Sequence, residues 1–239
     1  MPESQDFSKC SMSTGTLIQG TGTDIPRNGF LLPSNTVYDL RKSKLRASKK
    51  FEVWPLIYGT GIGTAVVLLS SFVIHINARQ LFHLYTRSHF WSTLYAPVLF
   101  SGALYWISFE GLITRRVLTR TSFDVEGYGD CDLCLEVRGS LIQMGCGCLL
   151  PGSLSYLTCT LAALHERTYP IPSLGNPKEV WSTVKRFCRG LRTTGSALLL
   201  AHCVMGSLLA GCMIKANQKA LKEEKQLLSN FGELSAPNE

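Results

Sequence analysis

Four long stretches of this chain contain no Lys, Arg, Asp or Glu, and they constrain its fold more than any other feature. They run from Val53 to Ala78, from Ser88 to Phe109, from Gly139 to His165 and from Thr193 to Ile214. A helix needs about 20 mostly apolar residues to cross the hydrocarbon core of a bilayer, and each stretch reaches that length. Buried helices of soluble domains are usually amphipathic and shorter, so a soluble four-helix bundle is the weaker alternative.

We therefore predict an all-α, four-span transmembrane helix bundle, with spans at about 53–77, 89–109, 139–164 and 193–214. Residues 1–50 form a polar and basic head rich in Ser, Thr and Gly. Such a segment buries too little apolar surface to offset its loss of conformational entropy, so we expect this N-terminal head to be disordered. Residues 51–221 make up the transmembrane domain, and residues 222–239 are a polar C-terminal tail.

The distribution of Lys and Arg predicts an orientation. Four spans put both termini on one side, and that side carries 14 Lys and Arg in the ranges 41–50, 115–138 and 215–225. The other side carries 8, in the ranges 79–87 and 167–192. The excess favours the cytosol or the mitochondrial matrix for the termini. Anionic lipid accounts for the net charge of +7, and no nucleic-acid-binding motif accompanies it.

A segment between the third and fourth spans has the pattern of an amphipathic helix. Asn176 and Pro177 provide a helix start. Apolar residues then recur on one face, namely Val180, Trp181, Val184, Phe187 and Cys188, with Lys and Arg on the other. This pattern predicts a helix in the plane of the membrane surface, the alternative being an ordinary helix in a soluble loop.

Small residues in the third and fourth spans predict close helix contacts, either within the bundle or with a partner. Pro151 lies near the middle of the third span and predicts a kink, with Ser153, Ser155 or a neighbouring helix bonding the freed carbonyl groups. We expect the partner interface to combine the segment Leu112 to Arg138 with these small residues. The candidates are Gly139, Gly145, Gly147, Gly206, Ala210, Gly211, Arg115 and Arg116.

Cys131 and Cys134 form a C-x-x-C motif, which in other settings is a redox pair or half of a zinc site. A four-cysteine zinc site would need Cys146 and Cys148 as well. Negative charge nearby raises the pKa of a thiol, so Asp130, Asp132 and Glu136 argue against a reactive thiolate. A structural pair, a redox pair and a metal ligand all stay open, and we predict no catalytic residue, cofactor or metal site.

His202 lies midway along the fourth span. An ionisable residue inside a membrane is a candidate for function, as a haem ligand or a proton relay. A neutral His that forms a hydrogen bond between helices is the interpretation we favour.

From the end of the second span onward, the order of these features is specific. Arg115-Arg116 is followed by Asp130-Cys131-Asp132-Leu133-Cys134, Arg138-Gly139, a small-residue helix with Pro151, and a loop with Pro170, Pro172, Pro177, Lys178 and Trp181. This order resembles the transmembrane protein 126 family, small four-span proteins of the mitochondrial inner membrane. The D-C-x-x-C-x-x-x-R element is closer to the A-type member than to the B-type. Leu150-Pro151 departs from the Tyr-Pro expected there.

The resemblance implies a role in building respiratory complex I. Family members act as assembly factors that hold membrane-arm intermediates, so the expected partners are complex I membrane-arm subunits, other assembly factors and inner-membrane lipids. The resemblance thus implies a scaffold in the mitochondrial inner membrane, with both termini in the matrix and no enzymatic activity. The alternatives are a membrane thiol oxidoreductase or metal-binding protein that uses Cys131 and Cys134, and a small-solute channel.

Overall fold

The computed structural model describes residues 34–47, 51–84, 89–119, 131–168, 177–190 and 192–234, and every regular element in these ranges is a helix. The α-helices are α1 (Ser34–Ala47), α2 (Trp54–Leu81), α3 (Phe90–Tyr95), α4 (Ser101–Phe109), α5 (Arg115–Thr119), α6 (Asp132–Met144), α7 (Leu150–Glu166), α8 (Pro177–Gly190) and α9 (Arg192–Leu234). A 3₁₀ turn, η2 (Phe51–Val53), precedes α2. The π-helical segments η3 (Ala96–Phe100), η4 (Glu110–Thr114) and η6 (Gly145–Leu149) join successive α-helices.

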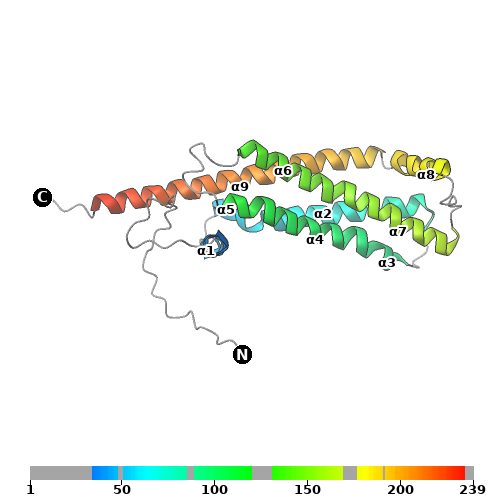
Figure 1. Ribbon diagram of the computed structural model, residues 1–239, viewed down its shortest axis with the longest axis horizontal. Coiled ribbons are helices and arrows are strands. Elements are labelled where there is room, and N and C mark those ends of the chain that lie inside the picture. The colour runs from blue at the N-terminus through cyan, green and yellow to red at the C-terminus, as the bar shows by residue number, and fades with distance from the viewer. Residues whose placement is uncertain are drawn as a thin grey trace, which may run out of the picture. The chain divides into compact units, whose positions relative to one another are not determined.

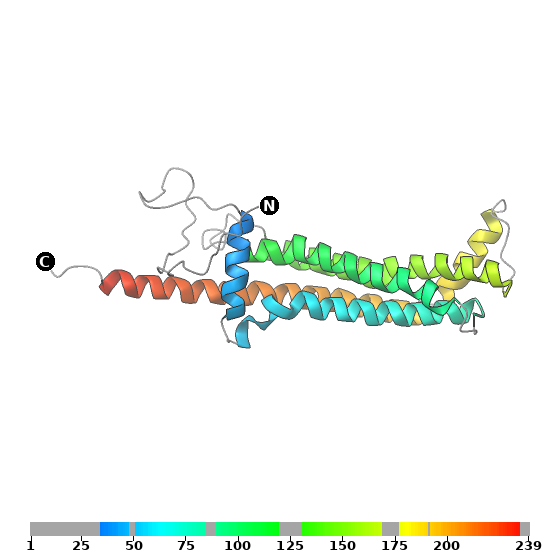
Figure 2. The ribbon, with the colours of Figure 1, turned by 90° about the horizontal axis from the view of Figure 1, so that it is seen from below.

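Within the described residues, four continuous helices are long and apolar enough to cross a membrane, and they run side by side (Figures 1 and 2). They cover Trp54–Leu81, Phe90–Thr119, Asp132–Glu166 and Arg192–Glu224, which confirms the predicted all-α four-span bundle. Large apolar side chains stay exposed on their outer faces, with Leu69 and Ile107 each 68% exposed and Leu200 65% exposed. Water would penalise so apolar a surface and lipid does not, so the outer faces favour a membrane over a soluble bundle.

The helices continue past the charge-free stretches, so part of the predicted Leu112–Arg138 segment is not a loop. Residues 112–119 belong to η4 and α5, and residues 132–138 belong to α6. Residues 120–130 lie outside the described part of the chain. Helix α9 likewise continues to Leu234, so much of the predicted tail is helical. Charged side chains do not end these helices, because Lys, Arg and Glu are themselves good helix formers. Lys219 Nζ on α9 pairs with Glu52 Oε1 at 2.7 Å.

The prediction of a disordered head is wrong for residues 34–47, which form helix α1. Figure 2 shows α1 lying across the ends of the spans. Its inward side chains bond the bundle: Arg41 Nη1 donates to the carbonyl oxygen of Leu118 at 2.7 Å. These contacts stabilise a helix that composition alone does not favour. The predictions for residues 1–33 and 48–50 concern positions outside the described residues.

Most of the buried apolar side chains in the described ranges fall into two clusters. One lies among α2, α4, α5, α6 and α9 and includes Tyr105 and Phe109, whose rings stack with centroids 5.2 Å apart. The other lies towards α8, where Phe187 packs against Tyr156 with ring centroids 5.1 Å apart. The predicted helix at 177–190 is therefore present, with Phe187 buried and Trp181 69% exposed. Its location at a membrane surface stays a prediction.

The π-helical segment η6 lies immediately before Leu150 and Pro151, and the helix from Asp132 to Glu166 passes through it without a break. Proline has no N–H group, so Pro151 cannot donate to the carbonyl oxygen of Gly147, four residues earlier. The hydroxyl of Ser70, on α2, donates to that oxygen at 3.1 Å. A neighbouring helix thus supplies the missing donor, one of the predicted solutions.

Candidate functional site

Helices α6 and α9 approach each other closely at small residues. A Cβ atom added to Gly206 would lie 2.6 Å from the carbonyl oxygen of Gly139 and 2.7 Å from Cα of Ser140. A Cβ atom on Gly139 would lie 2.8 Å from the carbonyl oxygen of Gly206 and 3.0 Å from Cβ of Ala210. Three predicted interface residues, Gly139, Gly206 and Ala210, therefore pack against one another inside the molecule.

Gly147 also serves an internal contact. A Cβ atom there would lie 2.4 Å from the imidazole ring of His202. His202 is 1% exposed, and its Nδ1 atom lies 3.2 Å from Nε2 of Gln143 on α6. This is the interhelical hydrogen bond that the sequence favoured for His202.

The other predicted interface residues face outward or reach flexible groups. A Cβ atom on Gly145 would meet nothing within 4 Å, and one on Gly211 would meet the carboxylate end of Glu136. Arg115 and Arg116 are exposed on α5, and Arg115 forms a hydrogen bond with Asn35 of α1. Of the predicted set, Gly145 leaves the most room for the helix of another protein.

Cys131 immediately precedes α6, and Cys134 lies in its first turn. Both side chains are exposed, and no disulfide joins these two described thiols. The backbone amide of Cys134, followed by the Cys134 thiol and the amide of Leu133, lowers the pKa of the Cys131 thiol, while the charge of Asp132 opposes this shift. At Cys131 the hydrogen bonds from the helix N-terminus outweigh the charge of Asp132, against the expectation that nearby acids dominate. Among the described residues, no group of three His, Cys, Asp or Glu side chains is placed to hold a metal ion.

A buried polar network lies at the end of the bundle near α8. The guanidinium group of Arg79 is 5% exposed and lies over the ring of Phe90, with Cζ 5.2 Å from the ring centroid. It donates to Thr93 Oγ1 at 3.0 Å and to the carbonyl oxygen of Leu84 at 3.1 Å. Nε2 of His75 lies 3.3 Å from the same Thr93 oxygen. The network joins α2 to α3.

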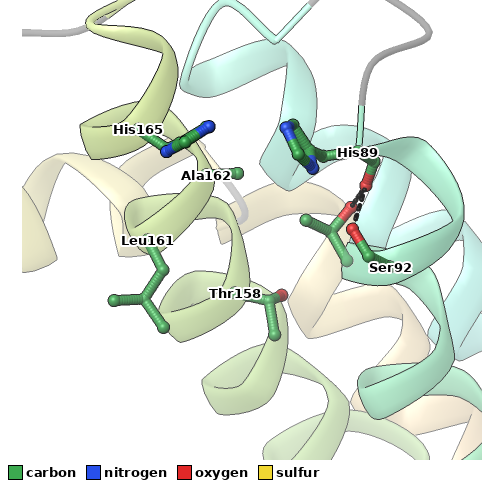
Figure 3. Close-up of a pocket in the computed structure, with 7 residues that line it drawn as sticks. His89, Ser92, Thr158, Leu161, Ala162 and His165 are labelled. Carbon is green, nitrogen blue, oxygen red and sulfur yellow. Dashed lines mark hydrogen bonds between the residues drawn. The ribbon is translucent and has the colours of Figure 1, made fainter.

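An open pocket of about 320 Å³ adjoins this network, between α3 and α7 (Figure 3). It is lined by His89, Ser92, Thr93, Thr158, Leu161, Ala162 and His165. The rings of His89 and His165 face each other edge to face, with centroids 5.1 Å apart. Nε2 of His89 lies 3.6 Å from Oε1 of Glu166, so the two form an ion pair when His89 is protonated. Sequence spacing gave no sign that His89 and His165 meet.

A second polar cluster surrounds Glu110, at the first position of η4. Glu110 Oε1 accepts hydrogen bonds from the Tyr38 hydroxyl and the Lys42 ammonium group, both on α1. Glu110 Oε2 accepts from Thr60 Oγ1 at 3.0 Å, and Thr60 Oγ1 lies 3.1 Å from Thr114 Oγ1. In the sequence, Glu110 is the first charged residue after the charge-free stretch from Ser88 to Phe109. A lone carboxylate at the end of a charge-free stretch was the available signal, but its partners lie far away along the chain.

Comparison with known proteins identifies relatives of this bundle. Residues 111–226 match the family described as Transmembrane protein 126. A Drosophila melanogaster protein named Transmembrane protein 126 is 24% identical over 207 residues, which cover 85% of this chain and 89% of that protein. No solved structure matches the chain.

Proposed function

Because this chain belongs to the transmembrane protein 126 family, we propose that it is an assembly factor for respiratory complex I in the mitochondrial inner membrane. It holds membrane-arm intermediates, together with other assembly factors, by helix–helix and loop contacts and without catalysis. The observation that carries this proposal is the family match over residues 111–226, which covers the second half of the bundle.

The geometry is compatible with a scaffold. Several polar side chains described within the spans bond from helix to helix: Gln143 to His202, Ser140 to the carbonyl oxygen of Cys203, and Ser70 to that of Gly147. The outer faces are apolar and suit contact with lipid or with the spans of another membrane protein. Gly145 offers one place on such a face where a helix can approach closely.

The proposal places both termini in the matrix, on the basis of the excess of Lys and Arg on their side. Protease added to mitoplasts then leaves an N-terminal tag intact and cuts between α7 and α8, if it cuts at all. Loss of the tag while the inner membrane is intact would reverse this orientation.

The assembly role is tested by purifying the tagged protein from digitonin-solubilised mitochondria and identifying its partners by mass spectrometry. We expect complex I membrane-arm subunits, and we expect Gly145→Leu to reduce their recovery. Gly111→Leu is the matched control, because a Cβ atom there also meets nothing within 4 Å, but on a different span. Absence of complex I subunits from the purified material, together with normal complex I in cells that lack the protein, would reject the role.

A further inference from the structure

The two oxygens of Glu110 have different partners. Oε2 accepts the hydroxyl of Thr60 on α2, and Thr114 lies beside that hydroxyl on η4. These bonds belong to the spans and orient the carboxylate without any contribution from α1. Oε1 points to α1, where it accepts from Tyr38 and Lys42. The spans therefore present one oriented carboxylate oxygen, and an ammonium group occupies it.

Helix α1 is held beside Glu110 mainly by polar contacts. None of the described side chains at positions 35–47 is fully buried, although Tyr38 and Leu45 pack against the core of the bundle. Arg41 Nη1 donates to the carbonyl oxygen of Leu118 at 2.7 Å in a partly buried contact, and Lys44 Nζ pairs with Glu224 Oε1 at 3.0 Å on the surface. Exposed ion pairs contribute little to stability. Because no described side chain of α1 is fully buried, while span residues such as Tyr105 and Phe109 are, α1 is held more weakly than the spans are held to one another.

The contacts of the Lys42 side chain show which kind of group the Glu110 carboxylate binds. Its Nζ atom lies 5.0 Å from the centroid of the Tyr38 ring, one helical turn away, while it pairs with Glu110. Burial lowers the pKa of Lys42, but the hydrogen bonds to Glu110 and Tyr38 outweigh burial and raise it. The group bound by Glu110 is therefore a cation. Lys and Arg are enriched beside the matrix ends of membrane spans. If the termini of this chain lie in the matrix, Glu110 lies at that same depth.

We propose that Glu110, held by Thr60 beside Thr114, is a receptor for a Lys or Arg side chain at the end of a transmembrane helix of the protein that this chain holds, and that α1 occupies the receptor until that helix arrives. The inference rests on the proposed assembly function. Lys42 and Tyr38 act as an internal competitor, so the half-buried receptor carboxylate is never left without a cation beside it.

The test uses the full chain in lipid nanodiscs and a synthetic probe. The probe is a fluorescent Leu/Ala helix long enough to span the bilayer, with one Lys at its end, and a matched helix carries Gln there. We expect Lys42→Ala to strengthen binding of the Lys probe at least threefold, by removing the competitor. We expect Glu110→Gln to weaken it at least tenfold, and the Gln probe to bind all versions alike and weakly.

Glu224→Gln is the control, because it breaks an α1 contact that does not touch Glu110. It should release α1 in part and should not weaken binding. Helix content by circular dichroism shows that each variant is folded. A folded Glu110→Gln protein that binds the Lys probe as well as the original chain would overturn the proposal, as would equal binding of the Lys and Gln probes.

Purification from mitochondria separates this proposal from the assembly role. Complex I subunits recovered equally with the original chain and with Glu110→Gln would overturn the receptor and leave the assembly role standing. Glu110-dependent binding of the Lys probe, with no complex I subunit recovered by any version, would overturn the assembly role and leave an ammonium receptor with other clients.

Discussion

Gly206→Ala tests whether the contact between α6 and α9 is set by backbone approach. The new Cβ atom would lie 2.6 Å from the carbonyl oxygen of Gly139 and 2.7 Å from Cα of Ser140. Ordinary contact is near 3.4 Å, so the helices must separate by about 0.8 Å at this point. Both obstructing atoms belong to the backbone, so no side-chain rotation relieves the overlap.

The loss in free energy of unfolding depends on the packing and the hydrogen bonds that this separation of α6 and α9 disturbs. Overpacking of this kind costs about 1–3 kcal/mol. Two hydrogen bonds lie within about one turn, from Ser140 to the carbonyl oxygen of Cys203 at 3.0 Å and between Gln143 and His202 at 3.2 Å. Interhelical hydrogen bonds in membranes contribute about 0.6 kcal/mol each. Gly152→Ala, on α7, is the control, because its Cβ atom meets nothing within 4 Å. The gain in helix propensity is common to both variants, so their difference should be about 2–4 kcal/mol.

The assay is unfolding by SDS in mixed micelles, followed by circular dichroism and tryptophan fluorescence. We expect Gly206→Ala to unfold at lower SDS and Gly152→Ala to match the original chain or exceed it. Equal free energies of unfolding for the two variants, within about 0.5 kcal/mol, would refute the argument that backbone contact sets this crossing. A bulky residue at Gly206 should therefore reduce partner recovery through unfolding, which is why Gly145 is the sounder probe of the surface.

Three further predictions concern single groups. Ser70→Ala should lower the free energy of unfolding by about 0.5–1.5 kcal/mol, because the carbonyl oxygen of Gly147 loses its donor. In a Pro151→Ala background the new backbone N–H of residue 151 should reduce that loss. An equal loss in both backgrounds, measured by SDS unfolding, would contradict the explanation. The rate of alkylation of Cys131 by iodoacetamide should reach half its maximum at a lower pH in the folded protein than after denaturation. The reason is that the amides at the helix N-terminus lower the pKa of the thiol only in the folded protein. Equal midpoint pH values for the two states, measured by mass spectrometry, would exclude this effect. Under the proposed assembly role, replacing both Cys131 and Cys134 by Ser should still restore complex I on native gels of deletion cells, because the proposed matrix location is reducing and disfavours a disulfide. Failure of a stably expressed double mutant would make the pair functional.

The amino-acid sequence determined the spans, because a charge in hydrocarbon is costly and each charge-free stretch is long enough to cross. It also determined that the third and fourth spans approach other helices closely, and that residues 177–190 form an amphipathic helix. Each conclusion depends on spacing within about 20 residues, where helical periodicity alone relates position to side-chain direction.

The tertiary structure decided which surfaces meet. Small-residue spacing predicts close approach, but only the fold shows that Gly206 meets Gly139 and that His202 fills the space beside Gly147. The helix at 34–47 and the pairing of Glu110 with Lys42 also came from the fold, because the two residues lie 68 positions apart along the chain. A carboxylate and an ammonium group attract only when folding brings them within a few ångströms, and no local pattern records that distance.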